Sequence, residues 1–358
     1  MGYPTQPSIA SPRCPVPAVI LDGSQSRRKQ LLGNSLGMAV LLSWCTTMGT
    51  CQQAIVLVGS GSTVPAPLVS KWADAYNQRN RNVQMRYVAI GADEGIVAIS
   101  HGSGDFALGE IPLTAQQRSK AGLVELPAVV IGIVPIYNIP GIHTELRFSG
   151  EVLADIFLGK IRSWSSPALA KLNPEVSLPD LPIRVVHRPA GKGSNYIFTE
   201  FLSKASSRFR SEVGVSASPK WPVGKPAERS SEMVDTVRSE PGAIGYVEAQ
   251  YAIESKIQFG LVLNASGHFI KASAESLKDA CRSVETPAFD KFSASLVDTS
   301  YDWLYLRVKR DDAKRTAALQ DFLKWVFSDG QQIAATAGYS ELPAPLRAKI
   351  SLSLRAVK

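Results

Sequence analysis

Residues that build disulfide frameworks and metal centres are scarce in this sequence. Its 358 residues include only four cysteines and four histidines, and no Cys-x-x-Cys motif or Cys/His pair has zinc-site spacing. This scarcity excludes a disulfide-rich scaffold and argues against a structural metal site. No internal repeat of about 20–50 residues is visible, which argues against a solenoid. We therefore expect neither a metal nor a cofactor.

Clustered positive charge is also missing, although the net charge is +8. Residues 1–50 contain four basic groups and one acid, so part of the excess lies near the amino terminus. The rest is spread along the chain without the Lys/Arg density of a nucleic-acid-binding face, and we expect no nucleic-acid partner. The mild positive balance suits an anionic ligand. With 45% apolar residues, the chain can form the cores of two ordinary domains.

The only marked hydrophobic run near the amino terminus is too short to cross a bilayer as a mature helix. It covers Leu31–Trp44 and follows the basic cluster Ser26–Lys29. This order predicts an export signal, with residues 1–54 as a leader and a periplasmic or otherwise exported product. A short buried helix is the alternative. The basic cluster partly resembles a twin-arginine signal, so the export route stays open, and Cys51 is a weak candidate for a lipid anchor.

After the leader, strand-type runs alternate with helix-type periodicity, which is typical of an α/β protein. Three units share one pattern: a buried strand, a turn containing glycine, and a helix. The three strands are expected at residues 55–58, 83–90 and 183–186. Each unit brings a helix amino terminus to the carboxyl edge of a sheet, where α/β proteins hold anions.

The same turns lie in a longer series of segments that resembles one family. The series resembles the phosphate-binding protein of the phosphate-specific ABC importer, the PstS family, over roughly residues 55–350. The matching segments, in chain order, are Gly59–Pro67, Lys71–Tyr76, Asp105–Leu113, Tyr137–Gly141, Asp155–Ile161, Lys220–Pro222, Pro241–Glu248, Asp321–Trp325 and Gly338–Tyr339.

This resemblance implies an α/β, two-lobed type II periplasmic binding protein fold with the ligand cleft between the lobes. Lobe I would comprise residues 55–133 plus 249–358, and lobe II residues 134–248. The implied partners are inorganic phosphate or a related oxyanion and an ABC transporter permease in the inner membrane. The protein is expected to be a monomer.

The resemblance also implies a ligand-binding set, in which several positions depart from the family pattern. Ala92 lacks the hydroxyl expected there, Glu110 replaces the Asp that accepts the phosphate proton, and Lys192 replaces a Ser. The expected ligand-binding residues are Thr63, Val64, Ala92, Glu110, Arg188, Lys192, Gly193 and Ser194. A carboxylate at this place selects phosphate over sulfate, because it accepts the proton that hydrogen phosphate carries and sulfate lacks.

Three functions are compatible with these residues. The leading hypothesis is an exported oxyanion-binding protein that binds phosphate and delivers it to an ABC importer. The alternative is a divergent relative that binds another small anion or acts as an extracytoplasmic sensor or adhesive protein. The third is a phosphate-ester hydrolase using Glu110, His187, Lys192 and Ser194, but the sequence lacks a metal cluster, a G-x-S-x-G elbow and P-loop spacing. We expect no catalytic residue and no enzymatic activity.

Overall fold

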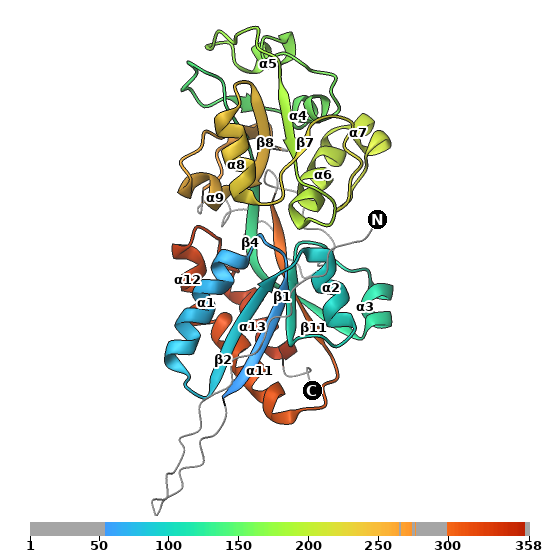
Figure 1. Ribbon diagram of the computed structural model, residues 1–358, viewed down its shortest axis with the longest axis vertical. Coiled ribbons are helices and arrows are strands. Elements are labelled where there is room, and N and C mark those ends of the chain that lie inside the picture. The colour runs from blue at the N-terminus through green and yellow to red at the C-terminus, as the bar shows by residue number, and fades with distance from the viewer. Residues whose placement is uncertain (1–53, 265, 274–275, 277–298, 355–358) are drawn as a thin grey trace, which may run out of the picture. The chain divides into compact units, whose positions relative to one another are not determined.

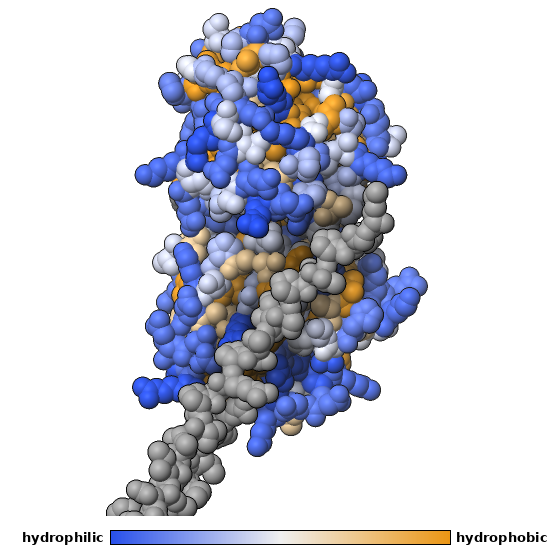
Figure 2. Space-filling view, in the orientation of Figure 1, coloured by the Kyte–Doolittle hydropathy of each residue, from blue (hydrophilic) through white to orange (hydrophobic). Residues whose placement is uncertain are grey.

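The computed structural model describes residues 54–264, 266–273, 276 and 299–354. The predicted export signal and the candidate lipid anchor at Cys51 lie outside the described residues. Within the described part, no helix has the length and apolar character needed to cross a membrane. Figure 2 shows mainly hydrophilic side chains on the visible face, with hydrophobic ones in separate patches.

Strands and helices alternate along the chain, which confirms the α/β class. The strands are β1 (Ile55–Gly61), β2 (Val83–Ala89), β3 (Phe106–Gly109), β4 (Leu123–Tyr137), β5 (Arg147–Phe148), β6 (Arg184–His187), β7 (Lys225–Pro226), β8 (Ala243–Glu248), β9 (Leu261–Leu263), β10 (Phe269–Ile270) and β11 (Thr299–Arg307). The helices are α1 (Ala66–Arg79), α2 (Ala92–Ser100), α3 (Ala115–Ala121), α4 (Gly150–Phe157), α5 (Pro167–Leu172), α6 (Gly193–Ala205), α7 (Ser207–Glu212), α8 (Ser230–Ser239), α9 (Ala249–Glu254), α11 (Ala313–Val326), α12 (Asp329–Thr336) and α13 (Ala344–Ser353).

One large sheet connects most of these elements. Its eight strands run in the order β2-β1-β3-β11-β4-β8-β6-β7, and β10, β9 and β5 form a separate small sheet. β1 lies parallel to β2 and β3, whereas β11 is antiparallel to both β3 and β4. The non-sequential position of β11 beside β3 brings a late segment of the chain next to the first three strands.

The long strand β4 changes partner partway along its length. Leu123–Gly132 pairs with β11, and Ile133–Tyr137 pairs with β8. In Figure 1, β4 runs from the group containing α1, α2 and α11 to the group containing α6 and α8. The change of partner falls between Gly132 and Ile133. The lobe boundary between residues 133 and 134 stays a prediction.

All three predicted strand–turn–helix units form. In α1 the apolar residues Leu68, Val69, Trp72 and Tyr76 recur at helical spacing and are buried. Pro65 and Pro67 flank its start, where the first N–H groups have no partner within the helix. The second unit joins β2 to α2 through Gly91, whose φ of 122° favours glycine. The third joins β6 to α6.

A buried ion cluster fixes the start of β3 to the segment after β11. The Asp105 carboxylate accepts from the N–H of Val58 at 2.8 Å, from Arg310 at 2.5 Å and from Arg315 at 2.6 and 2.7 Å. Asp105 is fully buried, and Arg310 is almost so. Because removing one partner would leave a buried charge without compensation, this cluster is expected to be important for stability.

Candidate functional site

The predicted ligand-binding residues lie at the carboxyl ends of strands and at the starts of helices. Glu110 follows β3 directly and Arg188 follows β6 directly, while Ala92 and Gly193 open α2 and α6. Thr63 lies in the turn between β1 and α1. β3 and β6 run in opposite directions in the sheet, because β4 is antiparallel to both β11 and β8. Their carboxyl ends therefore bring residues that are far apart in the sequence toward one another.

Glu110 packs directly against the first residue of α6. Its side chain is 0% exposed. A Cβ atom built on Gly193 would lie 1.4 Å from Glu110 Oε2 and 2.4 Å from its Cδ. Only glycine leaves room for this carboxyl group, which therefore lies at the positive end of the α6 dipole.

The environment of Glu110 favours its protonated form more than water does. Burial raises the pKa of Glu110 to about 7; the nearby Ser62 hydroxyl, its own backbone N–H and the Arg188 charge oppose that rise, and the Glu248 charge adds to it. Neither carboxyl oxygen has a hydrogen-bond partner in the described part of the chain. Glu110 therefore has a carboxyl group with unused hydrogen-bonding capacity at the site.

Arg188 supplies a buried cation with unused hydrogen-bond donors. The residue is 2% exposed. Its Nη2 donates to Thr63 Oγ1 over a long 3.5 Å, and Nε and Nη1 have no partner among the described residues. A buried guanidinium in this condition is costly unless an anion accepts from it.

Two residues that the sequence analysis missed hold the Arg188 backbone in place. The N–H of Arg188 donates to Tyr246 Oη at 3.1 Å, and Tyr246 Oη donates to Asn195 Oδ1. Asn195 Nδ2 in turn donates to the carbonyl oxygens of Pro189 at 2.6 Å and Ala217 at 3.0 Å. The position of Asn195 directly after Ser194 was the only signal in the sequence for this network.

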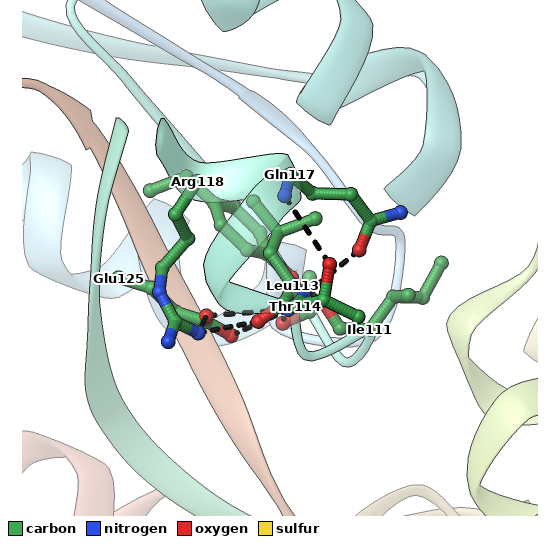
Figure 3. Close-up of polar contacts among 8 residues, drawn as sticks. Ile111, Leu113, Thr114, Gln117, Arg118 and Glu125 are labelled. Carbon is green, nitrogen blue, oxygen red and sulfur yellow. Dashed lines mark hydrogen bonds and ion pairs between the residues drawn. The ribbon is translucent and has the colours of Figure 1, made fainter. Parts of the chain in front are cut away.

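The loop that follows Glu110 is fixed by side chains from neighbouring elements (Figure 3). The Leu113 N–H donates to both carboxyl oxygens of Glu125 at 3.2 Å, and Arg118 binds Glu125 at 2.9 Å as well as the Leu113 carbonyl. Thr114 and Gln117 form a reciprocal capping box at the start of α3. On the other side, Tyr305 Oη donates to the Ile111 carbonyl at 2.6 Å. Glu110 is therefore held on a rigid base.

At the start of α6, the Ser194 hydroxyl is available to a ligand, whereas the Lys192 ammonium group is paired with Glu228. Ser194 is buried, and its Oγ has no partner within the described residues. Lys192 occupies the N-cap position of α6, but its Nζ lies 3.4 Å from Glu228 Oε2. The structure thus brings Gly193 beside Glu110, with Ser194 next in the chain, and it places the Lys192 ammonium in an ion pair with Glu228.

In the loops that precede α1 and α2, most of the candidate hydrogen-bond donors are backbone N–H groups. The Val64 N–H donates to Ser62 Oγ at 3.1 Å, so an incoming anion would have to replace this contact. Ala92 is fully buried at the first position of α2. A cavity of about 260 Å³ adjoins the first loop, and its lining includes Thr63, Val64, Arg229, Glu248, Gln250 and Tyr339.

His187, one of the groups considered for hydrolysis, lies in a packed position. His187 Nδ1 lies 3.1 Å from the Arg188 carbonyl oxygen, and its ring stacks on Trp221 at 5.7 Å between centroids. Burial lowers the pKa of His187, in keeping with this packed position. Across the described ranges, no three or more His, Cys, Asp or Glu side chains are grouped to hold a metal ion.

Comparison with known proteins gives consistent matches along most of the chain. A family model described as a PBP superfamily domain matches residues 43–330. The phosphate-binding protein PstS of Pasteurella multocida is 34% identical over 87% of this chain and 93% of its own length. PstS of Xylella fastidiosa strain 9a5c is 33% identical over 84% of this chain and 86% of its own. The crystal structure of an ABC-type phosphate transport receptor from Vibrio cholerae has a TM-score of 0.55 at 17% identity, covering 80% of this chain and 100% of that one. The fold is therefore that of the two-lobed periplasmic binding proteins.

Proposed function

The chain belongs to the PstS family of phosphate-binding proteins, and on that premise we propose that it binds inorganic phosphate outside the cytoplasm and delivers it to an ABC importer. The proposed partner is an inner-membrane permease, and the proposed state is a monomer in the periplasm. Binding involves no covalent step, so the proposed role is that of a carrier and not of an enzyme.

The observation that carries this proposal is the pairing of Arg188 with Glu110. A buried guanidinium with two unpartnered nitrogens, next to a carboxyl group with two free oxygens, suits a ligand that is both an anion and a proton donor. Hydrogen phosphate meets both requirements, since its anionic oxygens accept from Arg188 and its hydroxyl donates to Glu110. Sulfate carries no proton at neutral pH and would meet the carboxylate as a like charge.

The remaining proposed contacts come from the backbone and from hydroxyl groups. The N–H groups at the start of α6 (Gly193 and Ser194) and α2 (Ala92) would donate to the anion, together with the Thr63 and Ser194 hydroxyls. The Val64 N–H would join them after leaving Ser62. These donors come from both proposed lobes, residues 55–133 plus 249–358 and residues 134–248, so closure of the lobes would complete the site.

The Lys192 side chain has a smaller part in this proposal. Its ammonium pairs with Glu228 and is only partly buried. The Glu228 carboxylate offsets this charge at long range, so the part that we assign to Lys192 is the position of its backbone at the start of α6.

Isothermal titration calorimetry tests the proposal on protein stripped of ligand by partial unfolding and refolding. Phosphate, sulfate, arsenate and a phosphonate are compared, and tight one-to-one binding of phosphate but not of sulfate is expected. Arg188→Ala removes two charge-assisted hydrogen bonds and should weaken phosphate binding by about 3 kcal/mol, roughly a hundredfold. Arg184→Ala, on an exposed position of the same strand, is the matched control and should bind like the wild type. Absence of phosphate binding by protein that melts cooperatively would refute the proposal.

A further inference from the structure

A second carboxyl group is buried beside the proposed site, and the ligand contacts described above do not use it. Asp302 lies on β11 and is 0% exposed. Neither of its carboxyl oxygens has a hydrogen-bond partner in the described structure. An ionised carboxylate in such a position is costly, and the usual outcome is that the group keeps its proton.

The end of the ladder between β3 and β11 places Asp302 beside Glu110. β11 runs antiparallel to β3, with Trp303 paired to Gly109 and Leu304 paired to Leu108. The ladder ends at the pair Trp303–Gly109, and Asp302 and Glu110 are the next residues along the two chains. The charge of Glu110 acts on Asp302, in agreement with this proximity. The irregularity at this point lies on the other side of β11, where Ala128 of β4 is skipped between the pairs Asp302–Val129 and Trp303–Pro127. Side chains directly opposite each other on antiparallel strands have Cβ atoms about 4.5–5.5 Å apart, and like charges there are destabilising.

The charges around the pair do not support two ionised carboxylates. Among the described groups that act on the two carboxyls, Arg188 is the cation and Glu248 is a third carboxyl. The remaining titratable neighbours are tyrosines, whose own pKa values are raised by burial first and then by nearby acids; they are Tyr87, Tyr305 and Tyr339. One guanidinium therefore faces up to three buried carboxyl groups.

The pKa of Asp302 is shifted in the direction expected from this excess of carboxyl groups over cations. Burial raises the pKa of Asp302 well above its usual range, and the charges of Glu110 and Glu248 raise it further. Asp302 therefore holds its proton more strongly than an aspartic acid side chain in water does.

We propose that Asp302 keeps the proton of the Glu110–Asp302 pair, so that the site presents one carboxylate to the anion, and that loss of this proton ends phosphate binding at alkaline pH. The inference rests on the proposed function. With the proton in place, the Glu110 carboxylate lies near Arg188 and has no ionised partner at Asp302. Once Asp302 ionises, a second negative charge lies behind Glu110. Asp302 is therefore a positioning residue that acts through Glu110.

The first test is phosphate affinity as a function of pH for the wild type and for Asp302→Asn. The amide is close in size to the carboxyl and cannot ionise. The ionisation of phosphate itself affects both proteins equally and cancels in the ratio of dissociation constants. The ratio should be near one at neutral pH and then favour the variant by up to about tenfold for each pH unit above the ionisation of the wild-type pair. Asp321→Asn, exposed on α11, is the control and should follow the wild-type profile. Parallel profiles for the wild type and Asp302→Asn would overturn the inference.

The second test needs no phosphate, and its first measurement needs only the wild-type protein. Carbon-13 carboxyl NMR of the ligand-free wild-type protein should show one aspartate that stays protonated at neutral pH, well above the usual range for aspartate. A spectrum in which every aspartate is ionised at that pH overturns the inference even if phosphate binds. A protonated aspartate that is lost in Asp302→Asn supports it even if phosphate does not bind, and in that case only the proposed function fails.

Discussion

Because Glu110 packs against Gly193, adding a single methyl group at residue 193 should lower the stability of the protein. In Gly193→Ala the new Cβ would overlap Glu110 Oε2 at 1.4 Å and Cδ at 2.4 Å. Glu110 is fully buried and cannot turn out to solvent. Without this overlap, alanine in a helical position would stabilise the protein by up to about 1 kcal/mol relative to glycine. Overpacking of a buried site costs about 1–3 kcal/mol, so we expect a net loss of roughly 1–2 kcal/mol in the free energy of unfolding.

Phosphate affinity should fall in the same variant, because the displaced carboxyl can no longer accept the phosphate proton. Loss of one charge-assisted hydrogen bond corresponds to about 1.5–3 kcal/mol, or roughly tenfold to a hundredfold in affinity. Urea unfolding of the ligand-free protein and calorimetric titration measure the two effects separately.

Glu110→Asp is the second substitution of a double-mutant test with Gly193→Ala. It shortens the side chain by one methylene and draws the carboxyl away from Gly193. In the double variant the overlap is relieved, so the two stability changes should be non-additive by about 1 kcal/mol or more, in the favourable direction. A stabilised Gly193→Ala protein, or two changes that simply add, would show that the carboxyl does not pack on α6.

Three further variants test other parts of the structure. Asp105→Asn should lower the free energy of unfolding by about 3–5 kcal/mol in urea titrations, because it leaves Arg310 buried without its counter-ion; an unchanged midpoint would contradict this. Because the folded-state pKa of Glu110, about 7, lies above its usual value, Glu110 should favour the folded state most at acid pH and lose that contribution as pH rises to about 7. Glu110→Gln should flatten this decline in the ligand-free protein, and an unaltered pH–stability curve would count against it. Tyr246→Phe leaves Asn195 without its hydroxyl partner and should cost about 1–2 kcal/mol of stability while also weakening phosphate binding; the same loss of stability with unchanged affinity would remove its positioning role.

Local sequence patterns predict the strand–turn–helix units because each depends on residues that are neighbours in the chain. The apolar spacing in α1 and the position of Arg188 directly after a strand are signals of this kind. The helix α8 is less evident, because its sequence is mostly polar and only Met233, Val234 and Val237 are buried.

The parts of the site that could not be predicted all depend on strand order. Asp302 lies next to Glu110 only because β11 inserts between β3 and β4, and nothing in either segment specifies that neighbour. The hydrogen bond between Tyr246 and Asn195 likewise joins β8 to α6. The resemblance to a family supplied the residues that would touch the ligand but not those that hold them in place.

The unbroken strand β4 determines how the proposed lobes can move. Its hydrogen bonds to β11 end where those to β8 begin, so the residues around Gly132 and Ile133 belong to both halves of the ladder. A rotation of one lobe must then be distributed as small changes of φ and ψ within a continuous strand, since a break would expose buried backbone groups. The intact ladders on either side of Gly132 and Ile133 would oppose this rotation. The equilibrium between open and closed forms would therefore depend on the twist of β4 as well as on the contacts made by the ligand.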